Sequence, residues 1–255
     1  MERCGQGNRN EKYLLLLTIF TFFCASCAKT QTLGAGISVD SQGNLVINAP
    51  LYVIDETGDK PILKLAPSSL NNEVTGSIYN NINEGFMGIE ITGGIINGRL
   101  SVTIKKHDNY FLSNAKDFWY ISNDLFTDGA DVQIGGIRLA AKGQAGYSYP
   151  SIHLVNRYDL QPIRGTAIGR QTYYFYGNYY ELIYSMGDVN ISGKLNLPRK
   201  VNWIWYVDFD IHLKQGWNII RAEDNYPKII KNDFDEFDKF TSGQPSKDAV
   251  WVLLN

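Results

Sequence analysis

The residues that could act in catalysis or bind a metal lie apart in this sequence. The three histidines, His107, His153 and His212, fall on three separate segments, and no cysteine–histidine spacing typical of a zinc site is present. His212 shares the polar face of a predicted strand with Asp208 and Asp210, and a histidine–aspartate pair can orient a general base. The same arrangement is typical of a solvated strand face, and we favour that interpretation.

A cluster of carboxylates near the C-terminus is the second candidate for chemistry. The segment 233–238 supplies Asp233, Asp235, Glu236 and Asp238, and Ca²⁺ prefers oxygen ligands. The glycine of an EF-hand loop is missing, however, and phenylalanines interrupt the acidic residues. Because an exposed acidic face explains the cluster without an ion, we predict no metal and no cofactor.

No motif for nucleophilic catalysis or phosphate binding is found in the sequence. There is no G-x-S-x-G elbow, and the glycine pairs at 93–94 and 135–136 lie in strand-like runs without G-x-G-x-x-G or Walker spacing. Paired glycines in a strand indicate a bulge or a close crossing of sheets. The sequence therefore favours a protein without catalytic activity.

Tyrosine is the most unusual component of the composition. Residues 147–184 hold nine of the sixteen tyrosines. Alternation places Tyr174 with Tyr176, and Tyr180 with Tyr184, on one face each, and an exposed tyrosine face could bind a sugar or a partner protein. Cross-strand aromatic pairing within a sheet is the alternative, and it is the interpretation we favour.

Residues 1–26 have the pattern of a secretory signal peptide. Basic residues precede an uncharged apolar run at residues 13–23, and small residues follow that run. The run is shorter than the roughly 20 residues that a membrane-spanning helix needs. A single membrane-spanning anchor is therefore the less favoured interpretation.

The end of this segment, Ala25-Ser26-Cys27, resembles the lipobox of bacterial lipoproteins, whose cysteine is lipidated and becomes the first residue of the mature chain. Cys24 stands where leucine is usual, a departure similar to the relaxed boxes of spirochaete-type lipoproteins. The resemblance implies lipid attachment at Cys27 and anchoring to the outer or the cytoplasmic membrane, since several acyl chains on one residue give stable anchoring. Residues 27–33 would then form a polar tether.

The exported chain that this processing predicts is mildly acidic. Removal of residues 1–26 takes three basic and two acidic residues from the 24 Lys plus Arg and 26 Asp plus Glu. The remaining 229 residues carry 21 positive and 24 negative side chains, a net charge of −3. This balance argues against nucleic acid as a partner, because binding to phosphates needs a clustered basic surface.

Alternating apolar residues predict β-strands throughout the exported chain. The clearest case is residues 201–213, where seven apolar residues alternate with mostly polar ones. Asn97-Gly98 separates two further runs and predicts a tight hairpin, whereas Gly193 interrupts another run and predicts a bulge or a turn. The spacing of strands and turns predicts an all-β protein, most simply an antiparallel β-sandwich.

The strand pattern leaves room for few helices and one internal boundary. Residues 109–125 have apolar residues at helical spacing, and residues 227–240 fit either a short amphipathic helix or an irregular acidic loop. The glycine-containing stretch 140–150 predicts a division into an N-terminal β portion, 34–140, and a C-terminal one, 151–255. One continuous sandwich is the alternative.

Residues 177–218 resemble bacterial envelope lipoproteins that have no assigned activity. Residues 188–193 match a D-V-x-I-x-G segment, and residues 213–218 match the L-K-x-G-W-N that ends a following strand; residues 95–100 are similar to an earlier hairpin. The resemblance implies a surface or periplasmic β-sandwich and brings no catalytic residues. In this arrangement we expect Trp217 to cap the core just beyond a turn at Gly216.

We therefore expect a lipid-anchored exported protein with a non-enzymatic binding or structural role in the cell envelope. Its partners would be the membrane, through the anchor, and a glycan or another envelope protein. The alternative is a carbohydrate-binding module or a carbohydrate-active enzyme that uses the tyrosine-rich face. An enzyme of that kind would need two carboxylates that converge on a cleft.

Overall fold

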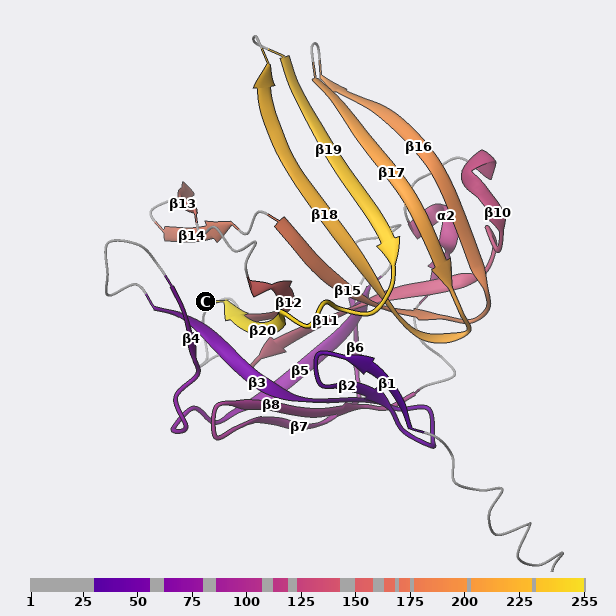
Figure 1. Ribbon diagram of the computed structural model, residues 1–255. Coiled ribbons are helices and arrows are strands. Elements are labelled where there is room, and N and C mark those ends of the chain that lie inside the picture. Colours follow the sequence, from indigo (N-terminus) through magenta and orange to yellow (C-terminus); the bar gives the residue numbers. More distant parts are fainter. Residues whose placement is uncertain are drawn as a thin grey trace, which may run out of the picture.

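The computed structural model describes residues 30–55, 62–79, 86–106, 112–118, 123–142, 150–157, 163–167, 170–174, 177–200, 203–230 and 233–254 (Figure 1). Eighteen strands of this part are hydrogen-bonded into one sheet, and β13 (Ile163–Ala167) and β14 (Arg170–Tyr174) form a separate hairpin. The prediction of an all-β protein is confirmed.

Seven strands of the large sheet close into a barrel. Around the ring they are β3 (Leu45–Asp55), β8 (Arg99–Ile104), β7 (Ile91–Ile96), β5 (Asn72–Tyr79), β11 (Gln133–Ala141), β12 (Ser151–Asn156) and β20 (Ala249–Leu254). All neighbours are antiparallel except β20 and β3, whose parallel pairing closes the ring. The pairings thus specify a barrel and do not single out a sandwich.

Shorter strands extend the edges of this barrel. A hairpin of β1 (Gln31–Gly34) and β2 (Ile37–Val39) pairs with the first half of β3, and β4 (Ile62–Leu65) pairs with its second half. On the other side, β6 (Phe86–Ile89) pairs with β5 and β9 (Ser113–Asn114) pairs with β11.

A second group of strands forms an outer sheet that stands above the ring in Figure 1. The strand that joins the two parts is β15 (Gly177–Ser185), which pairs with β11 and β12 on the barrel side and with β18 (Gly216–Ile230) on the other. Beyond β18 follow β19 (Asp233–Ser242), β17 (Trp203–Leu213), β16 (Val189–Lys200) and β10 (Phe126–Asp128). Only β17 and β19 are parallel among these outer pairs.

Alternating residues of the strands supply two hydrophobic clusters. In β8, Leu100, Val102 and Ile104 are buried in the barrel cluster while the residues between them are not. The second cluster lies under the outer sheet, where Phe209 of β17 and neighbouring apolar residues pack with Phe118 of the short helix α2 (Ala115–Phe118). Each such fully buried side chain contributes about 1.5–3 kcal/mol, so the period-2 pattern largely determines which faces turn inward.

The predicted hairpin at Asn97-Gly98 is confirmed. Both residues have positive φ, 51° and 72°, as a two-residue turn between β7 and β8 requires. A Cβ at residue 98 would lie 2.5 Å from the backbone oxygen of Ala66, so the neighbouring chain also requires glycine there.

Two local predictions are wrong. Gly193 marks no bulge or turn, because β16 runs straight through it and Gly193 lies opposite Phe209 in unbroken register. The described residues of the segment 227–240 are neither helix nor loop, because β18 extends to Ile230 and β19 begins at Asp233. β19 lies between β17 and β18 and hydrogen-bonds with both, and these tertiary contacts outweigh the helical spacing of its phenylalanines.

The helix predicted at 109–125 is much shorter than its pattern suggests. In the described part of that segment, β9 leads directly into the four residues of α2, and a 3₁₀ turn covers Asn123–Leu125. Phe118 still faces the core, so the apolar spacing reflects burial more than helix length. No helix in the described residues has the length and apolar character needed to cross a membrane.

Both predicted portions of the chain contribute neighbouring strands to the barrel, since β3 lies beside β20 and β11 beside β12. Part of the predicted tether belongs to the fold, because β1 begins at Gln31 and Leu33 is buried in the barrel cluster. The rest of the tether up to residue 29, the predicted signal peptide and Cys27 lie outside the described residues, as does most of the predicted boundary at 140–150.

Candidate functional site

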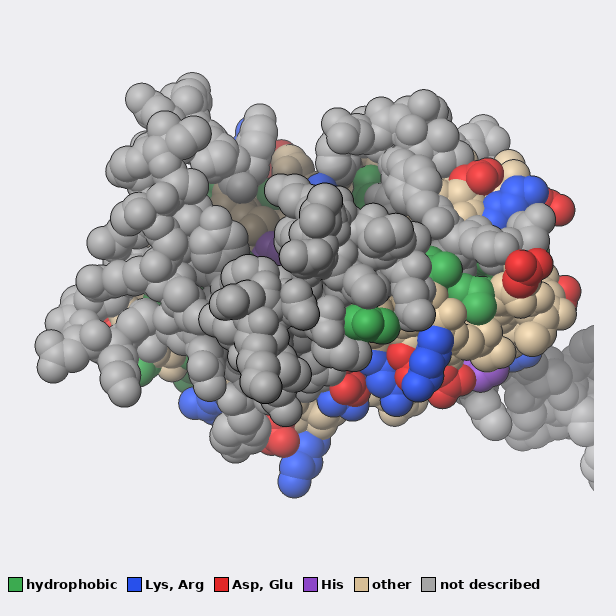
Figure 2. Space-filling view, turned by 90° about the horizontal axis from the view of Figure 1, so that it is seen from above, with side chains coloured by type: hydrophobic (Ala, Val, Ile, Leu, Met, Phe, Trp, Pro, Cys, Tyr) green, Lys and Arg blue, Asp and Glu red, His purple; other side chains and the backbone are tan. Residues whose placement is uncertain are grey.

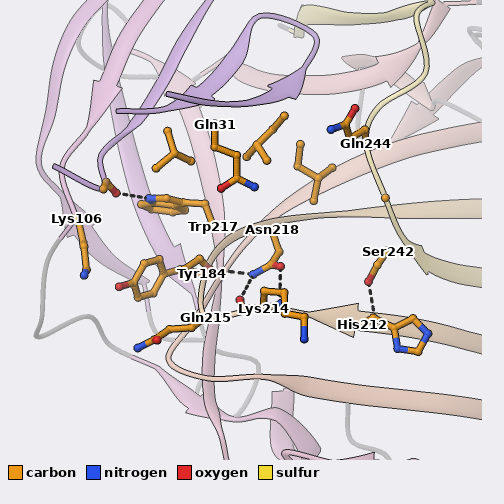
Figure 3. Close-up of a pocket in the computed structure, with 16 residues that line it drawn as sticks. Gln31, Lys106, Tyr184, His212, Lys214, Gln215, Trp217, Asn218, Ser242 and Gln244 are labelled. Carbon is orange, nitrogen blue, oxygen red and sulfur yellow. Dashed lines mark hydrogen bonds between the residues drawn. The ribbon is translucent and has the colours of Figure 1, made fainter. Parts of the chain in front are cut away.

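A hollow of about 500 Å³ opens where the end of the barrel meets the base of the outer sheet (Figure 3). We call it the amide hollow, because Gln31, Gln215, Asn218 and Gln244 line it. One wall comes from the β1–β2 hairpin and the turn before β3, and the opposite wall comes from the β17–β18 turn and the end of β19. Segments from both ends of the chain therefore build one site.

Aromatic and aliphatic side chains form the floor of the amide hollow. The Trp217 ring meets Tyr184 edge to face, with ring centres 4.8 Å apart, and its Nε1 donates a 2.8 Å hydrogen bond to the backbone oxygen of Gly43. Only 7% of Trp217 and 3% of Tyr184 is exposed. Their faces are therefore unavailable for stacking on a sugar ring, and Trp217 instead holds the β2–β3 turn against the outer sheet.

Asn218 fixes the turn between β17 and β18 that forms one wall. Its Oδ1 accepts a hydrogen bond from the backbone nitrogen of Lys214, and its Nδ2 donates to the backbone oxygens of Lys214 and Gly216, at 2.7–2.9 Å. Asp188 supports the same turn from outside, accepting from Lys214 Nζ at 2.6 Å and from the backbone nitrogen of Gln215 at 3.2 Å. The hydrogen bond from Lys214 is the main reason that the pKa of Asp188 lies below its usual value.

Neutral polar groups and cations surround the opening. Gln31 points into the space above Trp217, and Gln244 approaches from the opposite side, where its Nε2 donates to the backbone oxygen of Thr32 at 3.4 Å (Figure 3). Lys106 adds positive charge, the charge of Lys214 is paired with Asp188, and no acidic residue is among the described residues that line the hollow. Amides both donate and accept hydrogen bonds, so the site suits a hydroxyl-rich or anionic ligand.

His212 lies at the edge of the amide hollow in the surroundings that the sequence predicted. One ring nitrogen is 3.1 Å from Asp210 and the other is 2.9 Å from the side-chain oxygen of Asn190, while the side chains of His212 and Asp210 are both more than half exposed. Its backbone nitrogen donates to Ser242 Oγ. The pair is thus a hydrogen-bonded group on a solvated strand face.

The four tyrosines predicted for ligand binding do not come together on an exposed face in the described structure. Tyr180 and Tyr184 share one face of β15, and that face points into the barrel cluster, whereas Ile183 on the other face is buried in the second cluster. The Tyr180 hydroxyl accepts a hydrogen bond from the backbone nitrogen of Ser246 at 3.1 Å. Tyr174 lies in β14 opposite Ile163, and its side chain, like all of Tyr176, is outside the described part.

Most of the other candidates for chemistry have side chains outside the described residues. Within the described residues, no three histidine, cysteine, aspartate or glutamate side chains lie together in a way that could hold a metal ion. Asp238 is in β19, the side chains of Asp233, Asp235 and Glu236 are outside the described part, and so is His107.

No motif of the sequence indicates the residues that form the rim. Gln31, Lys106 and Gln244 are separated by 75 and 138 positions and belong to no motif, so only the closure of the sheet brings them together. The L-K-x-G-W-N segment was the one usable signal, since residues 214–218 form most of a wall.

Comparison with known proteins adds no relative: no protein-family model, no curated protein and no solved structure matches this chain.

Proposed function

We propose that the protein is a lipid-anchored, exported binding protein of the bacterial cell envelope, attached through Cys27 to the outer or the cytoplasmic membrane. The pattern of residues 1–27 supports the anchor. The amide hollow supports the binding role, because it has the size of a small-molecule site and a mostly polar rim around an apolar floor.

The position of Gln31 is the observation that carries this proposal. Gln31 lines the amide hollow and is four residues after Cys27, a length of chain that spans at most about 14 Å. A lipid at Cys27 would therefore hold the opening close to the membrane surface. We infer that the protein captures a polar ligand at, or just above, the membrane that anchors it.

Metabolic labelling with a palmitate analogue tests the anchor. We expect the wild-type chain to be labelled and the Cys27→Ala chain to be unlabelled. Cys24→Ala is the matched control, because it removes a cysteine three residues earlier and keeps Cys27. Label retained in Cys27→Ala, or a mature chain that still begins before residue 27 by mass spectrometry, would defeat the proposal.

Carbohydrate binding is the second candidate, and the amide-rich rim favours it. Sugar hydroxyls need groups that both donate and accept, as Gln31 and Gln244 can. The enzymatic form has less support. No carboxylate is among the described residues that line the amide hollow, and Glu181 is the one carboxylate among the described residues that line a second hollow, between β11, β12 and β15.

A glycan array with the full chain in detergent tests this candidate. We expect binding that falls about tenfold or more in Gln31→Ala and in Gln244→Ala, since each removes hydrogen bonds to the ligand. Gln133→Ala, on the exposed start of β11, should bind like the wild type. No binding on the array, or equal loss in all three variants, would count against a glycan.

Nucleic acid is not among the proposed partners. On the face seen from above, lysine and arginine side chains are interspersed with acidic ones (Figure 2), and the exported chain carries a net charge of −3. An envelope protein remains the other proposed partner, and chemical crosslinking on intact cells followed by isolation of the labelled chain would identify it.

A further inference from the structure

A second hollow, of about 380 Å³, lies where three strands separate on the side of the barrel. In β15, residues 182–185 pair with β11 and residues 179–180 pair with β12. In β11, residues 139–140 pair with β12. Between these pairings one residue of each strand remains in the middle: Arg138 of β11, His153 of β12 and Glu181 of β15. We call the space that they line the junction hollow.

The three middle residues present their side chains on one face. The residues on both sides of each, such as Ile137 and Leu139 around Arg138, are buried in the barrel cluster, so the middle residue points outward. All three line the junction hollow. A cation, an anion and an imidazole from three different strands therefore line the same hollow.

Tyr79 of β5 holds the cation in place. Its ring lies across Gly136, where a Cβ would come within 2.2 Å of the ring, and the Arg138 guanidinium sits 4.5 Å above the ring centre. A cation over an aromatic face is attracted by the ring. The glycine, the tyrosine and the arginine thus form a stack that fixes the positive side of the junction hollow.

Glu181 supplies the negative side of the junction hollow. Among the described residues, no side chain or backbone group donates a hydrogen bond to its carboxylate, although the residue is half-buried. Glu181 is attracted electrostatically by Arg138, and its negative charge also acts on the Tyr79 hydroxyl, whose pKa is raised by burial and further by this charge. Burial raises the pKa of Glu181 in spite of Arg138, and burial likewise lowers the pKa of His153, whose Nε2 is 2.8 Å from Ser151 Oγ. A half-buried carboxylate that has no donor from the described residues gains from a ligand that donates a hydrogen bond to it.

The two charges decide which ligand fits. A simple cation would gain from Glu181 but be repelled by Arg138, and a simple anion would meet the opposite conflict. A molecule with both charges a few ångströms apart satisfies both residues. We propose that the junction hollow binds a small zwitterion of the α-amino acid class, with its ammonium group on the Glu181 carboxylate and its carboxylate facing the Arg138 guanidinium.

Calorimetric titration of the full chain in detergent with each of the twenty α-amino acids tests this proposal. We expect at least one to bind, and we expect its N-acetyl derivative and its methyl ester each to bind about 10- to 100-fold more weakly, because each lacks one charge. If no amino acid binds, or if the derivatives bind as well as the parent, the proposal is wrong.

Two variants separate a direct role from a general loss of fold. Glu181→Gln should abolish the preference for the amino acid over its N-acetyl derivative, and Arg138→Gln should abolish the preference over the methyl ester. Glu73→Gln, an exposed carboxylate of β5 paired with Lys142, is the matched control and should change neither preference. Unchanged preferences in Glu181→Gln and Arg138→Gln would overturn the assignment. The site is distinct from the amide hollow, so neither result bears on the function proposed above.

Discussion

Replacement of Trp217 by phenylalanine should loosen the join between the barrel and the outer sheet. The change removes the Nε1 donor that holds the backbone oxygen of Gly43 at 2.8 Å, and it leaves the edge contact with Tyr184 largely in place. The lost hydrogen bond costs about 0.5–1.5 kcal/mol. The smaller ring buries on the order of 50 Å² less apolar surface, which adds about 1.2 kcal/mol at 25 cal/mol per Å².

These two contributions predict a fall of roughly 2 kcal/mol in the free energy of unfolding. Urea denaturation followed by far-UV circular dichroism measures it without relying on tryptophan fluorescence. Trp251→Phe is a matched comparison, because Trp251 is also buried and its Nε1 donates to the backbone oxygen of Ala35 at 3.0 Å.

Trp251→Phe should therefore destabilise the fold by a similar amount, while only Trp217→Phe should also weaken ligand binding in the amide hollow, whose floor it forms. If Trp217→Phe lowers stability by less than about 0.5 kcal/mol, neither the hydrogen bond to Gly43 nor the lost apolar burial makes its expected contribution, and the reasoning fails.

Two further predictions concern single contacts. Gly136→Ala should destabilise the fold by more than about 1 kcal/mol, because the new Cβ would displace the Tyr79 ring. Gly88→Ala is the control: a Cβ there would have nothing within 4 Å, so the melting temperature should stay within about a degree or two of the wild type. Equal melting curves for the two variants would contradict this. Asp188→Asn should lower stability at neutral pH and lose its effect in acid. The pKa of Asp188 is lowered in the folded chain, so the stability that its carboxylate contributes is present above the usual pKa of 3.8 and is lost as the pH falls through the folded value. Melting curves of Asp188→Asn and of the wild type at several pH values measure this. Lys214→Met, which removes the other partner of the contact, should show the same dependence on pH.

The sequence predicted the strands well because their signal is local. The alternation in residues 201–213 and the Asn97-Gly98 turn depend on neighbours a few positions apart, and both predictions describe what the structure contains. The segment 227–240 failed for the opposite reason. Its phenylalanine spacing fits a helix locally, but pairing with β17 and β18 decides its conformation, and a single sequence does not reveal those partners.

The two hollows were out of reach for the same physical reason. Each is assembled from side chains on strands that become neighbours only when the ring and the outer sheet have formed. Arg138, His153 and Glu181 are ordinary outward positions of three amphipathic strands, and only the separation of β11, β12 and β15 makes them converge. The tyrosines drew attention because they are numerous, yet the described pair of them, Tyr180 and Tyr184, is buried.

The parallel pair that closes the ring also constrains how the chain can fold. Trp251 of β20 lies opposite Leu51 of β3, 200 positions earlier, so this contact has a very large separation along the chain. β20 comes last in the order of the strands along the chain, and until it pairs, the edges of β3 and β12 that it covers have no partner. We therefore expect closure of the barrel to be a slow step of folding, and we expect chains that lack the β20 pairing to be the most prone to aggregation.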